Sequence, residues 1–180
     1  MSYRLFFGIR PPAAIRAGLL KTMTGIDNAR WQDDGQLHLT LRYVGEVETH
    51  MADDLAEAAA AIRFEPFELR ISGCGFFERK GRPTSIWAGI EPSDPLVRLQ
   101  RKIELACTGC GLPPEGRKFK PHITLARLNL SSGPPAPFLV SCTGLHLGPW
   151  LVDSYILYQS RLRDQGSLYE PVLTYSAGAQ

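Results

Sequence analysis

One short motif occurs twice in this chain, and the repetition constrains the fold more than any other feature. Its copies are Leu37-His38-Leu39-Thr40-Leu41 and Pro121-His122-Ile123-Thr124-Leu125. Each copy is rich in β-favouring residues, and alternate side chains of a strand point to one face, so the histidine and threonine of each copy share a face. At about 3.3 Å per residue the two groups emerge roughly 7 Å apart. Two such strands facing each other would gather two histidines and two hydroxyls around one small anion.

This set of side chains suits the cleavage of a phosphodiester. An unprotonated imidazole can take a proton from water or a hydroxyl, and a protonated one can give a proton to the departing oxygen. Histidine fits both tasks, because its ordinary pKa of about 6.5 leaves both forms populated near neutrality. Threonine hydroxyls can donate hydrogen bonds to the non-bridging phosphate oxygens, where charge must be stabilised. The sequence therefore predicts a site that uses no metal and no cofactor.

The repeated polar positions favour function over structural duplication. One His-x-Thr on a strand is weak, since most such histidines are simply half-buried or on the surface. A duplicated structural hairpin could repeat the leucines, but it has no reason to repeat polar residues, which cost free energy when buried without partners. Two copies in matching contexts therefore indicate one shared site.

Length and composition limit the classes of protein that fit. The chain has 180 residues, 44% hydrophobic content and a net charge of +2. It can bury a real core, and the small charge argues against a protein coated for nonspecific nucleic-acid binding, so any RNA contact must be local. No apolar run approaches membrane-spanning length, and the first residues lack a signal-peptide pattern. We expect a soluble cytoplasmic protein.

The four cysteines do not form a metal-binding pattern. Cys107 and Cys110 have redox or half-zinc-site spacing, but no second Cys-x-x-Cys or Cys/His pair completes a site. We expect Cys74, Cys107, Cys110 and Cys142 to be ordinary thiols.

Strands and helices are mixed along the chain, with joins that resemble hairpins. Alternation, turn signals and helix caps predict strands at 3–10, 37–44, 67–77, 85–90, 138–147, 151–161 and 169–174, a further strand at His122, and helices at 11–23, 49–62 and 94–109. This order favours an α+β fold with antiparallel sheets over a doubly wound parallel fold.

The motifs and their surroundings resemble the two-histidine phosphoesterase superfamily, in its RNA 2′,3′-cyclic phosphodiesterase branch, the LigT-like proteins formerly called 2′-5′ RNA ligases. The resemblance covers almost the whole chain. It rests on both His-x-Thr copies and on the segments 4–9, 41–46, 87–89, 119–127 and 160–169. One departure is Tyr43-Val44, where the family usually has Phe-Leu, and this core difference puts nothing catalytic in doubt.

The resemblance implies a fold and a reaction. It implies one bilobal phosphoesterase domain over residues 1–180, with two antiparallel sheets and flanking helices related by pseudo-twofold symmetry around a central cleft. The expected substrate is RNA ending in a 2′,3′-cyclic phosphate, with tRNA fragments as one candidate, and the product is a 2′-phosphomonoester. His38 is then the proton donor and His122 the proton acceptor, an order that the residues alone leave open. Thr40 and Thr124 would hold the phosphate, and the enzyme would act as a monomer.

Two arginines are further candidates for phosphate contact. Arg127 matches an arginine of the family motif, yet strict alternation places it on the face opposite His122. Either the strand ends or bulges after Leu125, or Arg127 lies outside the site. Arg42 shares a face with His38 under the same alternation, and it could equally be a solvated arginine at a strand end.

Basic and aromatic residues near the motifs could bind the rest of an RNA. The clusters 79–82 and 117–120 could line the approach of the backbone, although a charged hairpin tip is usually only solvated. Phe7, Phe119 and Tyr43 are candidates for base stacking.

Three other functions remain compatible with the sequence. Joining a 2′,3′-cyclic end to a 5′-hydroxyl as a 2′-5′ linkage would use the same residues with another nucleophile. A phosphodiesterase of small cyclic nucleotides would share the motifs. A non-catalytic RNA-binding module would need the arginines but not both histidines. The sequence does not identify the physiological RNA.

Overall fold

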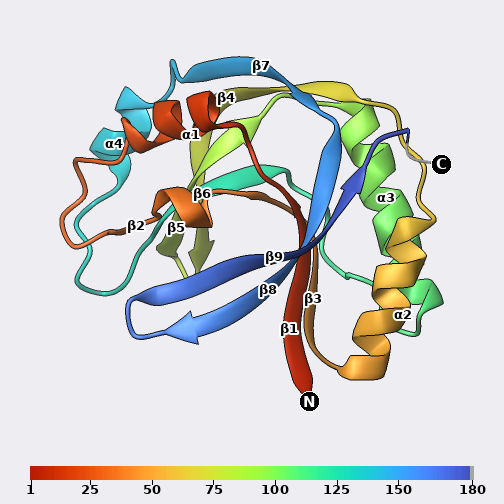
Figure 1. The fold of residues 1–180 in the computed structure, drawn as a ribbon. Helices are drawn as coiled ribbons and strands as arrows, with labels where there is room; N and C mark the ends of the chain where they lie inside the picture. Colours follow the sequence, from red (N-terminus) through yellow and green to blue (C-terminus); the bar gives the residue numbers. More distant parts are fainter. Residues whose placement is uncertain (179–180) are drawn as a thin grey trace.

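The computed structural model describes residues 1–178. Their strands and helices are placed as follows (Figure 1): β1 Ser2–Ile9, α1 Ala13–Leu20, β2 Arg30–Trp31, the short 3₁₀ helix η1 Asp34–Gln36, β3 Leu39–Glu48, α2 Thr49–Ala60, β4 Phe67–Arg79, β5 Arg82–Ile90, α3 Asp94–Gly109, β6 His122–Arg127, α4 Ala136–Ser141, β7 His146–Val152, β8 Ser154–Arg163 and β9 Gly166–Ser176. The predicted α+β class with antiparallel strands is confirmed.

The strands form one sheet, where two separate sheets were expected. Its order is β7-β4-β5-β6-β3-β1-β8-β9, with the short β2 paired to β6. Along this order four strands lie on each side of the β6–β3 junction, and β2 is a short addition on the β6 side. Two halves related by a pseudo-twofold axis would have this arrangement. The two sets merge because the motif strands β3 and β6 pair with each other, through Leu39 and Ile123.

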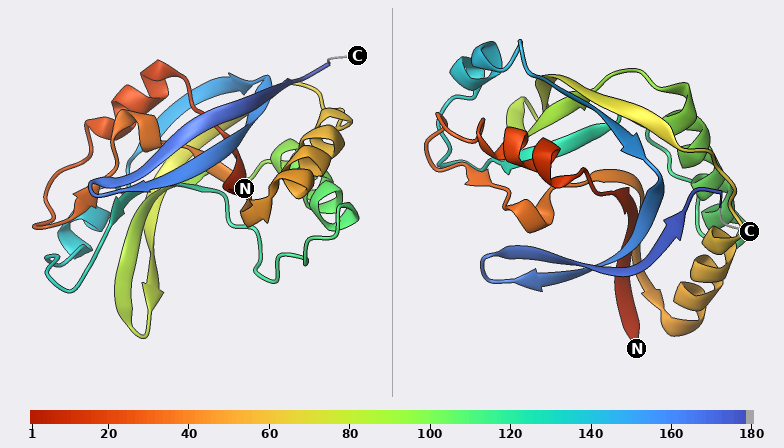
Figure 2. Two further views of the ribbon diagram at one scale, coloured as in Figure 1. Left: turned by 60° about the horizontal axis from the view of Figure 1, so that its bottom comes forward. Right: turned by 45° about the horizontal axis from the view of Figure 1, so that its top comes forward.

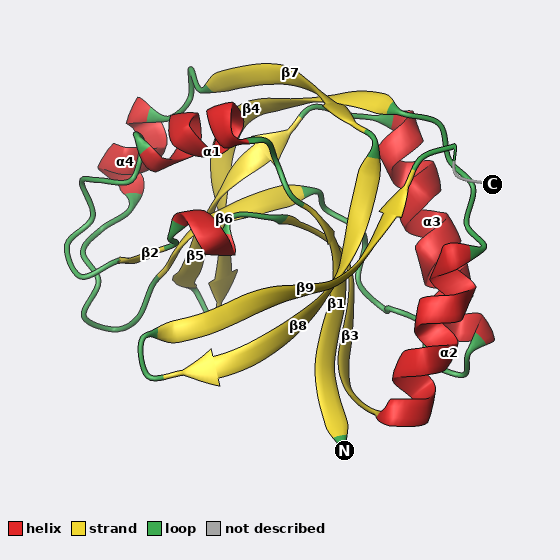
Figure 3. Ribbon diagram, in the orientation of Figure 1, coloured by secondary structure: helices red, strands yellow, loops and turns green. Residues whose placement is uncertain are grey.

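One helix of each half packs against a strand of the other half. In the region described, α3 connects β5 to β6 but packs on β3 and α2, while α1 follows β1 but packs on β7. Figures 1 and 3 show α2 and α3 together on one flank of the curved sheet, with α1 and α4 on the opposite side. A Cβ at Gly18 of α1 would stand 2.8 Å from the side chain of Leu147, so this glycine permits the close approach of α1 to β7.

One segment was assigned to the wrong class. The stretch 138–147 was predicted as a strand, but residues 136–141 form helix α4 and only His146 onward is β7. Proline lacks a backbone N–H and fits the first turn of a helix, so Pro135 and Pro137 start α4 where the apolar run alone suggested a strand.

Two of the four cysteines are joined, which corrects the expectation of four thiols. Cys74 of β4 and Cys142 at the end of α4 form a disulfide, and Cys107 and Cys110 are free. Among the described residues no group of three or more His, Cys, Asp and Glu side chains could hold a metal ion. No helix within residues 1–178 is long and apolar enough to cross a bilayer.

Candidate active site

The two motifs meet at the junction of β3 and β6. Leu39 and Ile123 are antiparallel partners, and both are fully buried. Continuing this register by one residue each way sets His38 across from Thr124 and Thr40 across from His122. Diagonal neighbours in such a pair lie about 7 Å apart, so the two histidines flank a space of the size of one phosphate. All four side chains are half-buried on the face opposite the leucine core.

Each motif histidine is held by the backbone in the same way. Nδ1 of His38 lies 2.7 Å from the carbonyl oxygen of Gln36, and Nδ1 of His122 lies 2.6 Å from that of Lys120. A carbonyl only accepts, so Nδ1 carries the hydrogen and Nε2 of the neutral ring is the free base. The sequence position of each carbonyl, two residues before the histidine, repeats with the motif.

The other ring nitrogens differ between the two copies. Nε2 of His38 lies 2.9 Å from the Thr40 hydroxyl. With Nδ1 protonated, Thr40 donates this hydrogen bond to the neutral ring. In the described chain Nε2 of His122 has no corresponding bond to Thr124. His122 is therefore the ring whose basic nitrogen is free for a substrate or water.

Strand β3 contains a bulge directly after the first motif. Gly8 of β1 pairs with Thr40, whereas the preceding Phe7 pairs with Arg42, so Leu41 is an extra residue. Adjacent residues of β1 point to opposite faces, and cross-strand partners share a face. Arg42 therefore lies on the core face with Phe7, not beside Thr40.

Strand β6 contains the equivalent bulge three residues after its histidine. The pairs Trp87–Thr124 and Ile86–Ala126 leave Leu125 as the extra residue. Ala126 is fully buried with Ile86, which sends the next side chain to the face of His122. The bulge after Leu125 is one of the two alternatives that the sequence left open.

Arg127 lies on the motif face because of this bulge. Its positive charge acts on both motif histidines, where it lowers the pKa of His38 and that of His122. Its side chain is exposed. Of the two arginines considered, this one is placed to reach an anion between the histidines.

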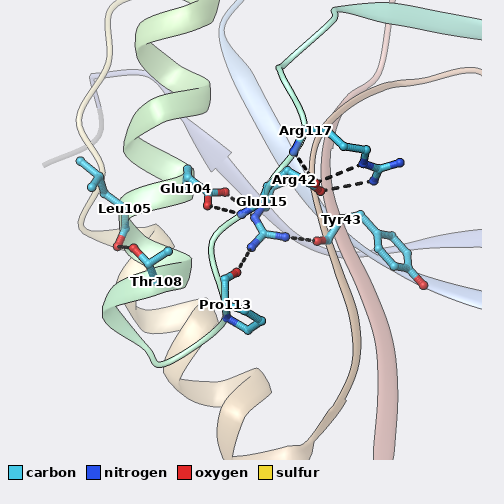
Figure 4. Close-up of polar contacts among 8 residues, drawn as sticks. All are labelled: Arg42, Tyr43, Glu104, Leu105, Thr108, Pro113, Glu115 and Arg117. Atoms are coloured by element: carbon cyan, nitrogen blue, oxygen red, sulfur yellow. Dashed lines mark hydrogen bonds and ion pairs between the residues drawn. The ribbon is translucent and has the colours of Figure 1, made fainter.

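Arg42 is bound elsewhere, which contradicts its predicted position beside phosphate. Its buried guanidinium forms an ion pair with Glu104 of α3 and donates hydrogen bonds to the carbonyl oxygens of Tyr43 and Pro113, each at 2.6 Å (Figure 4). These contacts fix α3 and the loop that follows it against β3. Arg42 is thus a structural residue, displaced from the site by the bulge at Leu41.

The aromatic residue of β1 beside His38 is Phe6, and the prediction of Phe7 was wrong. The Phe6 ring centroid is 4.7 Å from that of His38, and Tyr169 of β9 meets His38 edge-on at 4.9 Å. Tyr158 stacks on Phe6 at 4.9 Å. Phe7 is 1% exposed and packs in the core. The apolar alternation Leu5, Phe7, Ile9 was the available signal that Phe7 points inward.

His122 has a different set of neighbours. Phe77 of β4 meets its ring edge-on at 4.8 Å, and Trp87 of β5 lies 5.9 Å away. The ammonium of Lys120 lies 5.1 Å from the Trp87 ring centroid and 5.6 Å from that of Phe77. Phe119, the predicted stacking residue, instead packs half-buried against the core. Sequence reasoning missed Phe77 because its strand is distant in sequence from the motif.

Burial and positive charge keep both rings neutral. Burial lowers the pKa of His38 to about 4, and the positive charges of Arg127 and Arg10 act in the same direction, against the opposing hydrogen bond to the carbonyl of Gln36. Burial also lowers the pKa of His122, again with Arg127 and Lys120. A bound phosphate would offset these charges and favour protonation of a ring.

A third histidine shares the local geometry but not the surroundings. Nδ1 of His146 lies 3.1 Å from the carbonyl of Gly144, and Nε2 lies 3.3 Å from the Ser72 hydroxyl. His146 is exposed on the edge strand β7, away from the β3–β6 junction. The backbone-bound ring alone therefore does not define the site. The pairing of two motifs does.

The sequence of this chain is similar to those of a known family of RNA-processing proteins. Residues 11–140 match the model of the 2′-5′ RNA ligase superfamily. A protein of Aeropyrum pernix named RNA 2′,3′-cyclic phosphodiesterase is 35% identical over 150 residues, which cover 82% of this chain and 85% of that protein. One of Thermus thermophilus with the same name is 32% identical and covers 96% of this chain and 89% of its own length.

A solved structure extends the likeness to the whole fold. Escherichia coli LigT complexed with 3′-AMP superposes with a TM-score of 0.79 at 25% identity, covering 99% of this chain and all of LigT.

Proposed function

This chain belongs to the 2′-5′ RNA ligase superfamily, and on that basis we propose that it is an RNA 2′,3′-cyclic phosphodiesterase that works by acid–base catalysis between two histidines, without a metal. The observation that carries the proposal is the register through Leu39 and Ile123. It brings two separately encoded His-x-Thr pairs to one point. Their relatives in Aeropyrum pernix and Thermus thermophilus carry this enzyme name.

The reaction has one step for each histidine. His122 takes a proton from water through Nε2, and the water oxygen attacks phosphorus. The bond from phosphorus to O3′ breaks, and His38 gives its proton to O3′. The products are a 2′-phosphomonoester and a free 3′-hydroxyl, and proton exchange with solvent resets both rings. The assignment of donor and acceptor follows the family resemblance, and the free Nε2 of His122 agrees with it.

The remaining groups stabilise the charge. Thr40 and Thr124 donate hydrogen bonds to the non-bridging oxygens, and Arg127 adds a cation on the same face. Burial lowers the pKa of His38 to about 4, so its ring is neutral before the substrate binds. The anionic phosphate raises that pKa, so binding itself loads the acid.

We further propose that the enzyme acts as a monomer. All the site residues come from one chain, so a single bilobal domain over residues 1–180 is sufficient to form the active site. We place the enzyme in the cytoplasm, where RNA fragments with cyclic ends, such as those of tRNA, are its substrates.

The decisive experiment is product analysis on a short RNA ending in a 2′,3′-cyclic phosphate. We expect a 2′-phosphate end, and the His38→Ala variant as control should bind the RNA without converting it. A 3′-phosphate product would contradict the assigned leaving oxygen. RNA binding without turnover by the parent protein would indicate a binding module, and turnover of cyclic mononucleotides alone would indicate a small-nucleotide enzyme.

A further inference from the structure

The β4–β5 hairpin ends in three cations that the fold does not need. Arg79 and Arg82 are direct cross-strand partners, and Lys80 and Gly81 form the two-residue turn between them. Like charges directly opposite each other destabilise a strand pair. Among the residues that the structure describes, neither arginine nor Lys80 has an acidic partner within ion-pair distance. The tip therefore carries unbalanced positive charge.

The turn is also unfavourable for the residue it contains. Lys80 has φ 52° and Gly81 has φ 75°, the conformation of a type I′ turn. Such turns prefer Asn, Asp or Gly at the first central position, where a long side chain is strained. A hairpin selected only for stability would use neither this lysine nor facing arginines. Conflicts between local preference and fold of this kind are expected at functional positions.

These cations form one wall of a large groove. The groove holds about 1000 Å³ and lies between the hairpin tip and the loop that follows β6. The hairpin projects from the body of the sheet (Figure 2). The rest of the lining is uncharged. It combines Leu128, Leu130, Pro134 and Pro135 with the polar Asn129 and Ser132, and Leu130 is 83% exposed.

The groove lies directly beyond Arg127 along β6 and β5. Arg127 pairs with Ser85 across β6 and β5, and the next residues, Leu128 and Thr84, are joined by a backbone hydrogen bond of 2.9 Å and line the groove. On β4, Phe77 contacts His122 and Arg79 stands two residues further on, so both side chains point to the same face. A polyanion leaving the histidines along β4 would meet Arg79 next.

We propose that this groove holds the nucleotides on the 5′ side of the cyclic phosphate, as single-stranded RNA. The three cations face the phosphates, as in the basic grooves that follow the backbone of a single strand, and the uncharged wall takes the sugars and bases. The inference rests on the proposed function and adds a substrate preference to it. The enzyme favours oligonucleotides over cyclic mononucleotides, which are too short to reach the groove.

The test compares two substrates in two variants. The variant Arg79→Gln/Arg82→Gln removes the facing charges, and Arg98→Gln/Arg101→Gln removes two exposed charges from α3 as the matched control. The substrates are an RNA of about ten nucleotides with a cyclic phosphate end and a 2′,3′-cyclic mononucleotide. For the hairpin variant we expect KM for the RNA to rise about tenfold, with kcat and the mononucleotide rate unchanged. The control variant should leave all of these values unchanged.

Salt dependence and thermal stability give two independent readouts. Fluorescence anisotropy at several salt concentrations gives the slope of the logarithm of the RNA binding constant against the logarithm of the salt concentration. In the hairpin variant the magnitude of this slope should fall by about 1.4, since each phosphate contact on a single strand contributes about 0.7. The melting temperature should stay level or rise, because the variant relieves like-charge repulsion.

Other outcomes would overturn the inference. Equal losses on both substrates would mean that the hairpin only shapes the active site, and an unchanged KM for the RNA would mean that the groove is unused. An equal effect of the control variant would mean general charge attraction. If the parent protein converts neither substrate, the proposed function fails, and the anisotropy measurement still decides whether the hairpin binds RNA.

Discussion

The two copies of the motif share a backbone and differ in what surrounds it. In both, the histidine is bound through Nδ1 to the carbonyl two residues earlier, and a bulge follows three residues later. After the bulge the copies diverge. Arg42 anchors α3 in the first copy, where the second has the buried Ala126. Arg127 faces the site in the second copy, where the first has Tyr43. The backbone thus sets a symmetric pair of rings, and two positions per copy make the pair unequal.

Removing either histidine should produce the largest effect and should break the comparison most directly. General acid–base catalysis is worth typically 10²- to 10⁴-fold, so His38→Ala and His122→Ala should each lower kcat by about that factor with RNA binding nearly intact. The matched control is His146→Ala, which removes a ring with the same local geometry. A His38 or His122 variant that retains parent turnover would refute the two-histidine mechanism.

Substitution of Arg127 should lower activity, whereas substitution of Arg42 should lower stability. Arg127→Ala removes a cation from the site and should lower kcat by about 10²-fold without loss of stability. Arg42→Ala leaves Glu104 unpaired and should lower the free energy of unfolding by about 3 kcal/mol. Turnover and chemical denaturation of both variants measure this. An Arg42→Ala variant that is stable but inactive would contradict the structural role of Arg42.

Substitution of the two threonines tests a smaller difference between the two copies of the motif. Thr40→Val and Thr124→Val each remove a hydrogen bond to developing charge, so we expect losses of up to about 10²-fold, smaller than those of the histidines. Thr40 also bonds to Nε2 of His38, and Thr124 has no such bond within the described chain. Only Thr40→Val should therefore shift the pH dependence as well as the rate. Identical pH profiles for the two variants would argue against distinct roles.

The pH profile should lie on the acid side of neutrality. Catalysis needs one ring protonated, and burial lowers the pKa of both rings below the ordinary 6.5, that of His38 to about 4. Rising pH removes the needed proton, so kcat/KM should be bell-shaped with its optimum below about pH 6.5. Arg127→Gln removes a nearby positive charge that lowers the pKa of both histidines, so the pH optimum should move to a higher value. An optimum that stays fixed would mean that Arg127 does not act on the histidines.

Chelation should have the smallest effect of all. Histidines and hydroxyl donors are sufficient for the proposed chemistry, so turnover in excess EDTA should equal turnover without it. Loss of activity that a divalent ion restores would point to another mechanism.

Alternation along the strands predicted much of the site but not its corrections. It placed His38 with Thr40 and His122 with Thr124 on one face, and the structure agrees. It failed for Arg42 and Arg127, because a bulge shifts the face of every later residue and neither bulge is marked by glycine or proline. Pairing with β1 and β5 decides both bulges, and that information lies outside the motif.

The fold shows the same division between local and distant information. A helix that begins at Asp94 and ends near Gly109 and Gly111 was predicted from its apolar stripe, a local signal, and α3 is Asp94–Gly109. The merging of two expected sheets into one depends on a pairing between residues far apart in sequence. Phe77 was missed because its strand is distant in sequence from the motif. Phe6 was missed although the local alternation of Leu5, Phe7 and Ile9 was sufficient to direct Phe7 inward.

The single pair that joins β3 to β6 has a mechanical consequence. Within residues 1–178, Leu39 and Ile123 form the one register pair between β3 and β6. A phosphate bound by Thr40 on one side and by Thr124 and Arg127 on the other would link the two halves of the sheet across the junction of β3 and β6. The substrate would then stiffen the protein at its joint, and hydrolysis would loosen the joint again as the product leaves.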